Sequence, residues 1–148
     1  MSAYRRVLAL VALNADAENV ARRAAEMARF HGAALALAAV VDYVPGFESD
    51  HLPFKTPAQM RAAICADVRT KLDALVAGGG EVIVAAGSEA ESVAAIFRSW
   101  QPDLVLVSAR ARHGLAADVQ RQPFDLLLVQ TQRQGYVGRL INALSFPF

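Results

Sequence analysis

The chain has few of the residues that point directly to a class of function. Its 148 residues include one cysteine, Cys65, which excludes a disulfide within the chain and favours a reducing cytoplasm. The three histidines, His31, His51 and His113, lie too far apart in sequence to form a local metal motif, so we expect no metal site. Basic residues number 15 and acidic residues 14, and this net charge of +1 gives no general reason to expect a nucleic-acid partner.

Long hydrophobic runs are also missing from the N-terminus. The segment MSAYRRVLALVALNADA has the outline of a secretory signal, with two arginines, an apolar run and small residues. Its apolar run, Val7–Leu13, has seven residues, which is the lower limit for a signal and far too short to span a bilayer. A first strand explains the run better, because a repeated strand-then-helix pattern follows. We therefore expect a cytoplasmic protein without membrane contact.

Apolar residues are abundant, at 55 % of the chain, and they form short runs that alternate with helical patterns. A chain of this length favours a single domain with a substantial core. Alternating strands and helices predict an α/β fold, in which an open parallel sheet carries helices on both faces. The expected strands are Val7–Leu13, Leu35–Val41, Val82–Ala86, Leu104–Val107 and Leu126–Val129.

Local signals place helices between these strands. The first is expected over Asp16–His31, with Asp16 serving its N-terminus and Gly32 closing it. The second begins at a capping box formed by Thr56 and Gln59, with a proline at its first position.

The third helix begins at a similar box, formed by Ser88 and Glu91. Its apolar residues fall on one stripe, which is more typical of a core than of a stacking platform. The stripe consists of Val93, Ile96, Phe97 and Trp100. Cys65 lies within the second helix among alanines, and we expect a packed, unreactive thiol there.

Three stretches resemble the universal stress protein family. They are YRRVLALVALNADAENVARRAAEMARFHGAALALAAVVD, the Gly-Ser entry to the third helix, and PDLVLVSARARHGL. The resemblance covers about Tyr4 to Gln130. It implies five strands in the order 3-2-1-4-5 and a homodimer, and it implies that some members bind ATP whereas a UspA-like branch does not. We expect a universal stress protein-like domain over residues 1–131 and an amphipathic tail over residues 132–148.

The loop after the fourth strand decides which branch the chain resembles, because ligands of open parallel sheets bind at the carboxyl ends of strands. ATP-binding members have G-x-x-G-x9-G-[ST] there, and its glycines let backbone amides approach phosphates. The resemblance aligns the first two glycines with Ser108 and Ala111. It aligns the third glycine with Arg121 and the hydroxyl residue with Gln122.

The other positions that ATP-binding members use also favour the loss of the phosphate site. Gly114 is the glycine that remains, and Ala12 stands where ATP-binding relatives have an acidic residue after the first strand. Arg110, Arg112 and His113 offer donors for an anion, although we favour a solvated basic loop. We therefore expect a dismantled phosphate site and no bound cofactor.

Two groups of residues that include aspartates could suggest a hydrolase triad and an acidic pocket, but neither is expected to form a site. Ser108 and His113, with Asp118 or Asp125, supply the residue types of a hydrolase triad, but no G-x-S-x-G elbow accompanies them. Asp103 precedes its strand rather than ending it, which argues against an acidic pocket with Asp16 and Asp42. We expect no catalytic residues.

These observations favour a non-catalytic regulatory or interaction protein of the universal stress type. The alternative is an adenine-nucleotide-binding sensor, or a weak nucleotide hydrolase, with a degenerate phosphate loop. The fifth strand is expected at the two-fold axis of a homodimer, because an apolar edge strand is a liability unless it is paired or covered. Its residues are Leu126, Leu127, Leu128 and Val129.

The last 14 residues, GYVGRLINALSFPF, carry a narrow apolar stripe at helical spacing. We expect a short helix that covers the sheet over strands four and five, in its own subunit or in the dimer partner. Binding of an unknown protein client is the alternative. The candidate packing residues are Tyr136, Val137, Leu140, Ile141, Leu144, Phe146 and Phe148.

Overall fold

The computed structural model describes residues 4–12, 16–41, 56–109 and 123–130. The strands are β1 (Arg6–Leu10), β2 (Ala34–Val41), β3 (Glu81–Ala86), β4 (Leu104–Ser108) and β5 (Asp125–Val129). The helices are α1 (Ala17–His31), α2 (Pro57–Val76) and α3 (Glu89–Trp100). All strand pairs are parallel and the order is β3-β2-β1-β4-β5, which confirms the expected α/β sheet.

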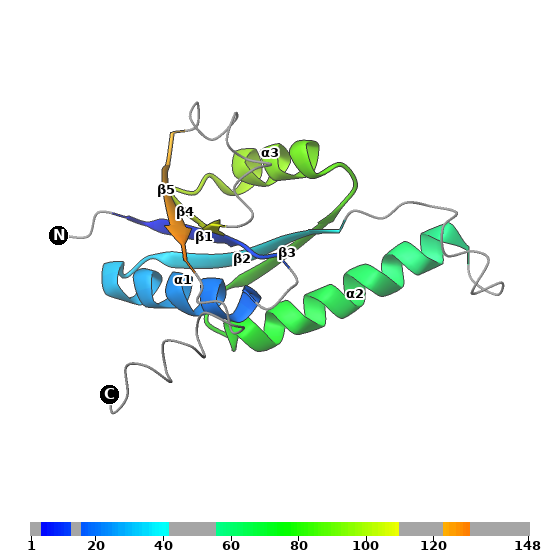
Figure 1. Cartoon of the computed structure of the whole chain (residues 1–148), viewed down its shortest axis with the longest axis horizontal. Helices are drawn as coiled ribbons and strands as arrows, with labels where there is room; N and C mark the ends of the chain where they lie inside the picture. Colours follow the sequence, from blue (N-terminus) through cyan, green and yellow to red (C-terminus); the bar gives the residue numbers. More distant parts are fainter. Residues whose placement is uncertain (1–3, 13–15, 42–55, 110–122, 131–148) are drawn as a thin grey trace, which may run out of the picture.

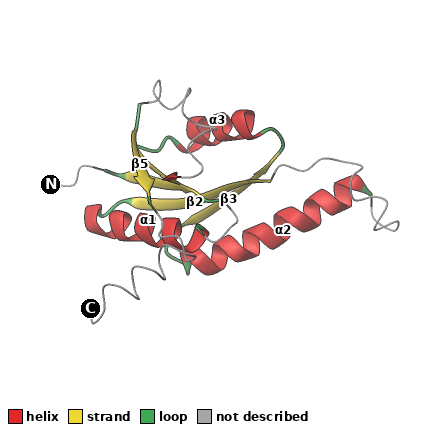
Figure 2. Ribbon diagram, viewed as in Figure 1, coloured by secondary structure: helices red, strands yellow, loops and turns green. Residues whose placement is uncertain are grey.

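Helices cover both faces of this sheet. Figure 1 shows α1 and α2 on one face and α3 on the other, and Figure 2 shows the same three layers by secondary structure. Right-handed crossovers place α1 and α2 together, and the return from β3 to β4 sends α3 to the opposite face. Side chains alternate accordingly along β1, where Val7 and Ala9 face the α1–α2 core and Leu8 faces the α3 core.

The local helix signals are confirmed in part. The Thr56 capping box is present, since Gln59 N donates to Thr56 Oγ1 at 3.1 Å and Thr56 N donates to Gln59 Oε1 at 2.9 Å. Gly32 closes α1 in the left-handed conformation, with φ 64°. The box expected at Ser88 is wrong, because the Ser88 side chain makes no capping hydrogen bond. None of the described helices combines the length and apolarity that crossing a bilayer requires.

Polar contacts tie the amino ends of three strands together. Asp103 accepts from the backbone N–H groups of Arg5 and Arg6 at 2.8 and 2.9 Å. The Arg6 guanidinium lies 4.0 Å from the centre of the Trp100 ring, and its Nε donates to the Trp100 carbonyl. Trp100 Nε1 in turn donates to Glu81 Oε2 at 3.0 Å. The tryptophan is a core residue, as expected, but it also links α3 to β1 and β3.

Candidate functional site

The carboxyl ends of β1 and β4 mark the point where the strand order reverses. β1 pairs with β2 on one side and with β4 on the other. The chain therefore adds β2 and β3 on one side of β1, and then crosses back to add β4 and β5 on the other side. Ligands of open α/β sheets bind in the crevice at such a switch point. The described residues at this crevice include Ala12 after β1, Asp16 before α1 and Ser108 at the end of β4.

A buried hydrogen bond lies at this position. The Ser108 hydroxyl donates to Asp16 Oδ2 at 3.0 Å. The two residues are 2 % and 4 % exposed, and they are the buried polar residues of the described part of the chain. Burial would penalise either group without a partner, so the bond stabilises both and joins the end of β4 to the start of α1.

Asp16 lies at the N-terminus of α1, as expected, but its side chain has a partner that the sequence analysis did not predict. Asp16 does occupy the N-cap position of α1, and its carbonyl accepts from Val20 N at 3.0 Å. Its carboxylate makes no capping bond and reaches Ser108 instead. The pair is separated by 92 positions, so no local pattern could reveal it. The expected order of strands was the available signal, because it places the end of β4 beside the loop that follows β1.

The structure brings together only part of the predicted loop constellation. Ser108 is buried at the switch point, and Ala12 is half-buried after β1. The remaining candidate positions lie outside the described residues: Arg110, Ala111, Arg112, His113, Gly114, Arg121 and Gln122.

Asp125, one of the two acidic candidates for a triad with Ser108, lies far from this crevice. Ser108 pairs in register with Val129, whereas Asp125 pairs with Leu104 at the other end of β5. Four residue steps along the strand, about 13 Å, separate Asp125 from Val129, so Asp125 does not form a triad with Ser108. Asp125 accepts from the Tyr4 hydroxyl at 2.7 Å, and this bond raises the pKa of Tyr4. Within the described ranges, no group of three His, Cys, Asp or Glu side chains is placed to hold a metal.

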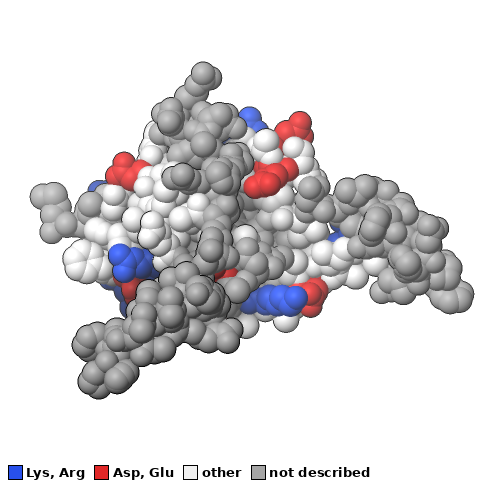
Figure 3. Space-filling view, viewed as in Figure 1, with Lys and Arg blue, Asp and Glu red and all other residues white. Residues whose placement is uncertain are grey.

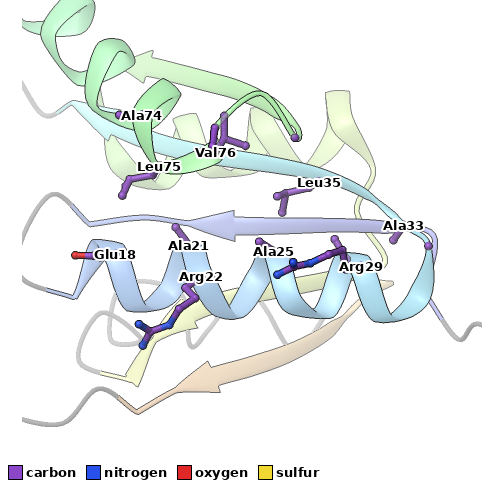
Figure 4. Close-up of a pocket in the computed structure, with 14 residues that line it drawn as sticks. Glu18, Ala21, Arg22, Ala25, Arg29, Ala33, Leu35, Ala74, Leu75 and Val76 are labelled. Carbon is purple, nitrogen blue, oxygen red and sulfur yellow. The ribbon is translucent and has the colours of Figure 1, made fainter.

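A second hollow lies between α1 and the last turns of α2 (Figure 4). Its volume is about 790 Å³, within the range of small-molecule sites. Small apolar residues form most of its lining, and the charged lining residues, Glu18, Arg22 and Arg29, are exposed. Arg22 already donates to Asn19 Oδ1 at 2.8 Å. No buried polar group of the described residues is directed into this hollow. It is therefore a weaker candidate for a specific ligand site than the switch point.

Charge is dispersed over the surface. Figure 3 shows acidic and basic side chains interspersed among uncharged ones on the face in view. The described residues on this face therefore offer no extended basic surface of the kind that binds polyanions.

The fifth strand is an edge strand, as expected, and its apolar residues are half-buried. Leu126 and Leu128 pack toward the α3 core, and Leu127 and Val129 pack toward the α1–α2 core. The tail, residues 132–148, lies outside the described residues.

Known proteins share this architecture. UspA from Lactobacillus plantarum superposes with a TM-score of 0.61 at 16 % identity, covering 87 % of this chain and 99 % of that chain. A universal stress protein from Archaeoglobus fulgidus in complex with dAMP gives 0.56 at 16 % identity, with 86 % and 98 % covered. A universal stress protein in complex with cAMP gives 0.58 at 18 % identity, with 88 % and 100 % covered. At such identities these likenesses show the fold.

Sequence comparison gives the family itself. A comparison with curated proteins finds no match. A sequence model of the universal stress protein family, in contrast, matches residues 3–122. Because that match spans most of the chain, the protein belongs to the universal stress protein family.

Proposed function

We propose that this chain is a non-catalytic regulatory protein of the universal stress type whose switch-point crevice does not hold ATP. The observation that carries the proposal is the buried bond from Ser108 to Asp16. A triphosphate in this crevice would bring several negative charges close to the Asp16 carboxylate. Like charges repel, so a phosphate group placed beside Asp16 at the end of β4 is disfavoured.

The position of Ser108 adds a steric argument. Glycine at the position of Ser108, the last residue of β4, would let backbone amides approach a phosphate closely, and any Cβ there narrows the approach. The side chain of Ser108 is buried and engaged with Asp16. The other residues of the ATP-binding pattern are also replaced in this sequence, by Ala111, Arg121 and Gln122. These replacements support the same proposal for the rest of the loop.

A second candidate function is an adenine-nucleotide sensor. The related structures in complex with dAMP and cAMP favour it, because these ligands carry a single phosphate. A monophosphate places less negative charge beside Asp16 than a triphosphate does.

Isothermal titration calorimetry with ATP, AMP and cAMP, each with and without magnesium, separates the two functions. The proposal expects no tight binding of ATP and no release of phosphate from it. Micromolar affinity of the wild-type chain for ATP would overturn the proposal, and binding of a monophosphate alone would establish the second candidate. A chain carrying Asp16→Asn and Ser108→Gly lacks the charge and the Cβ, so any gain in ATP affinity identifies the pair as the obstacle.

We also infer that the chain forms a homodimer through the edge of β5. Asp125 N donates to Asp103 O in the neighbouring connection, so Asp125 faces β4. Backbone direction alternates along a strand, and the N–H and C=O groups of Leu126 and Leu128 therefore face outward. Within the described part of the chain, no side chain is hydrogen-bonded to these groups. A second copy, pairing antiparallel at this edge, would satisfy them.

A further inference from the structure

The sheet has a second edge, β3, whose backbone is also directed outward at alternate residues. Gly87 N donates to Val41 O at 3.0 Å, so Gly87, just after β3, faces β2. By alternation, the N–H and C=O groups of Val82, Val84 and Ala86 face away from the sheet. The strand is rich in β-branched residues and half-buried, a composition that favours pairing with another strand.

A charged side chain lies on this edge. Nη1 of Arg69, an exposed residue of α2, donates to the outward carbonyl of Val82 at 3.2 Å. This bond places a guanidinium beside the backbone atoms that an incoming strand would need. At β5, the described residues provide no such contact.

We propose that Arg69 keeps the β3 edge closed to strand pairing, so that a second copy of this chain pairs at β5 alone. A strand that approached β3 would have to break the bond between Arg69 and Val82. It would also have to displace the guanidinium or bury it without a counter-ion, and burial of an unpaired charge is costly. Charged side chains at sheet edges prevent edge-to-edge association in this way.

This inference goes beyond the proposed homodimer, although the two share one assay. Sedimentation velocity over a concentration series compares the wild-type chain with Arg69→Ala. Alanine has a higher helix propensity than arginine, so this change does not weaken α2 intrinsically. We expect Arg69→Ala to form species larger than the wild-type assembly, increasing with concentration, because two open edges allow open-ended growth.

Two control variants isolate the guanidinium. Arg69→Lys retains a cation at the edge and should behave as the wild type does. Arg98→Ala removes an exposed arginine from α3, on the opposite face of the sheet from α2 (Figure 1), and should also leave the assembly unchanged. An Arg69→Ala chain with the same size distribution as wild type and Arg98→Ala would overturn the proposal.

A substitution in β5 allows pairing at β3 to be tested independently of the dimer proposed at β5. Leu128→Pro removes an outward N–H, so it blocks pairing at β5 without removing a bond to β4. The single variant should be a monomer, and circular dichroism checks that it is folded. With Arg69→Ala added, it should dimerise through β3. If the wild-type chain is itself a monomer, the homodimer proposal fails, yet Arg69→Ala must still increase association for the present inference to stand.

Discussion

The hydroxyl of Tyr4 donates to Asp125 Oδ2 at 2.7 Å and joins the residues at the amino ends of β1 and β5, which are 121 positions apart. The hydrogen bond to Asp125 raises the pKa of Tyr4 above its ordinary value of 10.0, with smaller contributions from burial and from the charges of Asp125 and Asp103. Folding therefore favours the neutral phenol. The stabilisation is complete below pH 10.0 and is lost as the pH rises through the folded-state pKa.

Tyr4→Phe should accordingly lower stability near neutral pH by about 1 kcal/mol or less, because the bond is exposed. The difference between wild type and variant should shrink as the pH rises above 10.0. Urea denaturation at pH 7.5 and at alkaline pH measures both values. Asp125→Asn is the control, since it should return the tyrosine titration toward its ordinary range. A pH-independent difference would contradict the assignment.

The single tryptophan of the chain reports on the amino end of the sheet. Replacing Glu81 by alanine leaves the buried Trp100 N–H without the acceptor that it has at 3.0 Å. The expected loss of stability is about 1–3 kcal/mol. Glu81→Gln keeps an oxygen acceptor and should cost less. Tryptophan fluorescence during urea unfolding measures both variants, and equal stability of Glu81→Ala and wild type would show that this bond contributes little.

The Ser108–Asp16 pair should behave as a coupled unit. Ser108→Ala and Asp16→Ala are each expected to destabilise the fold by about 1–3 kcal/mol, because each removes a buried hydrogen-bond partner. The double variant should cost less than the sum of the two, with a coupling of about 0.5–3 kcal/mol. Chemical denaturation of all four proteins supplies the cycle. Strict additivity would mean that the bond adds nothing to stability and would weaken the argument against ATP.

Local patterns in the sequence predicted the elements well, although β1 ends at Leu10 and not at Leu13 as expected, and they failed where tertiary contacts decide. Thr56 and Gln59 meet three residues apart, so their box could be predicted from the sequence alone. Ser88 has the same pattern but makes no capping bond, and the first turn of α3 instead carries Glu89 and Glu91, whose charges favour a helix N-terminus. A capping motif shows which bond is available, whereas the surrounding fold determines whether it forms.

The candidate site was harder to predict than the fold for the same reason. Asp16 before a helix and Ser108 after a strand each satisfy a local expectation, and neither pattern contains the other residue. The order of strands came from the family resemblance rather than from hydrophobic periodicity. Periodicity gives the buried face of each strand, but it carries no information about which strands are neighbours.

The tail is the last feature open to a direct test. In the described structure, α3 packs over β2 and β3, and Leu126 and Leu128 on the same face of β5 are half-buried. The tail follows β5 in the sequence, and we expect its apolar stripe, which includes Tyr136, Leu140 and Leu144, to cover this region. Each buried side chain of this kind contributes about 1.5–3 kcal/mol before ordering costs. Deleting residues 135–148 should therefore lower the melting temperature or the solubility. A full-length chain with Leu140 and Leu144 changed to serine should reproduce the loss, because it keeps the length but not the apolar stripe. Calorimetry and light scattering measure stability and dimerisation together. If both are unchanged in the truncated chain, the tail does not pack on this sheet, and a pull-down with and without it becomes the test for an external protein client.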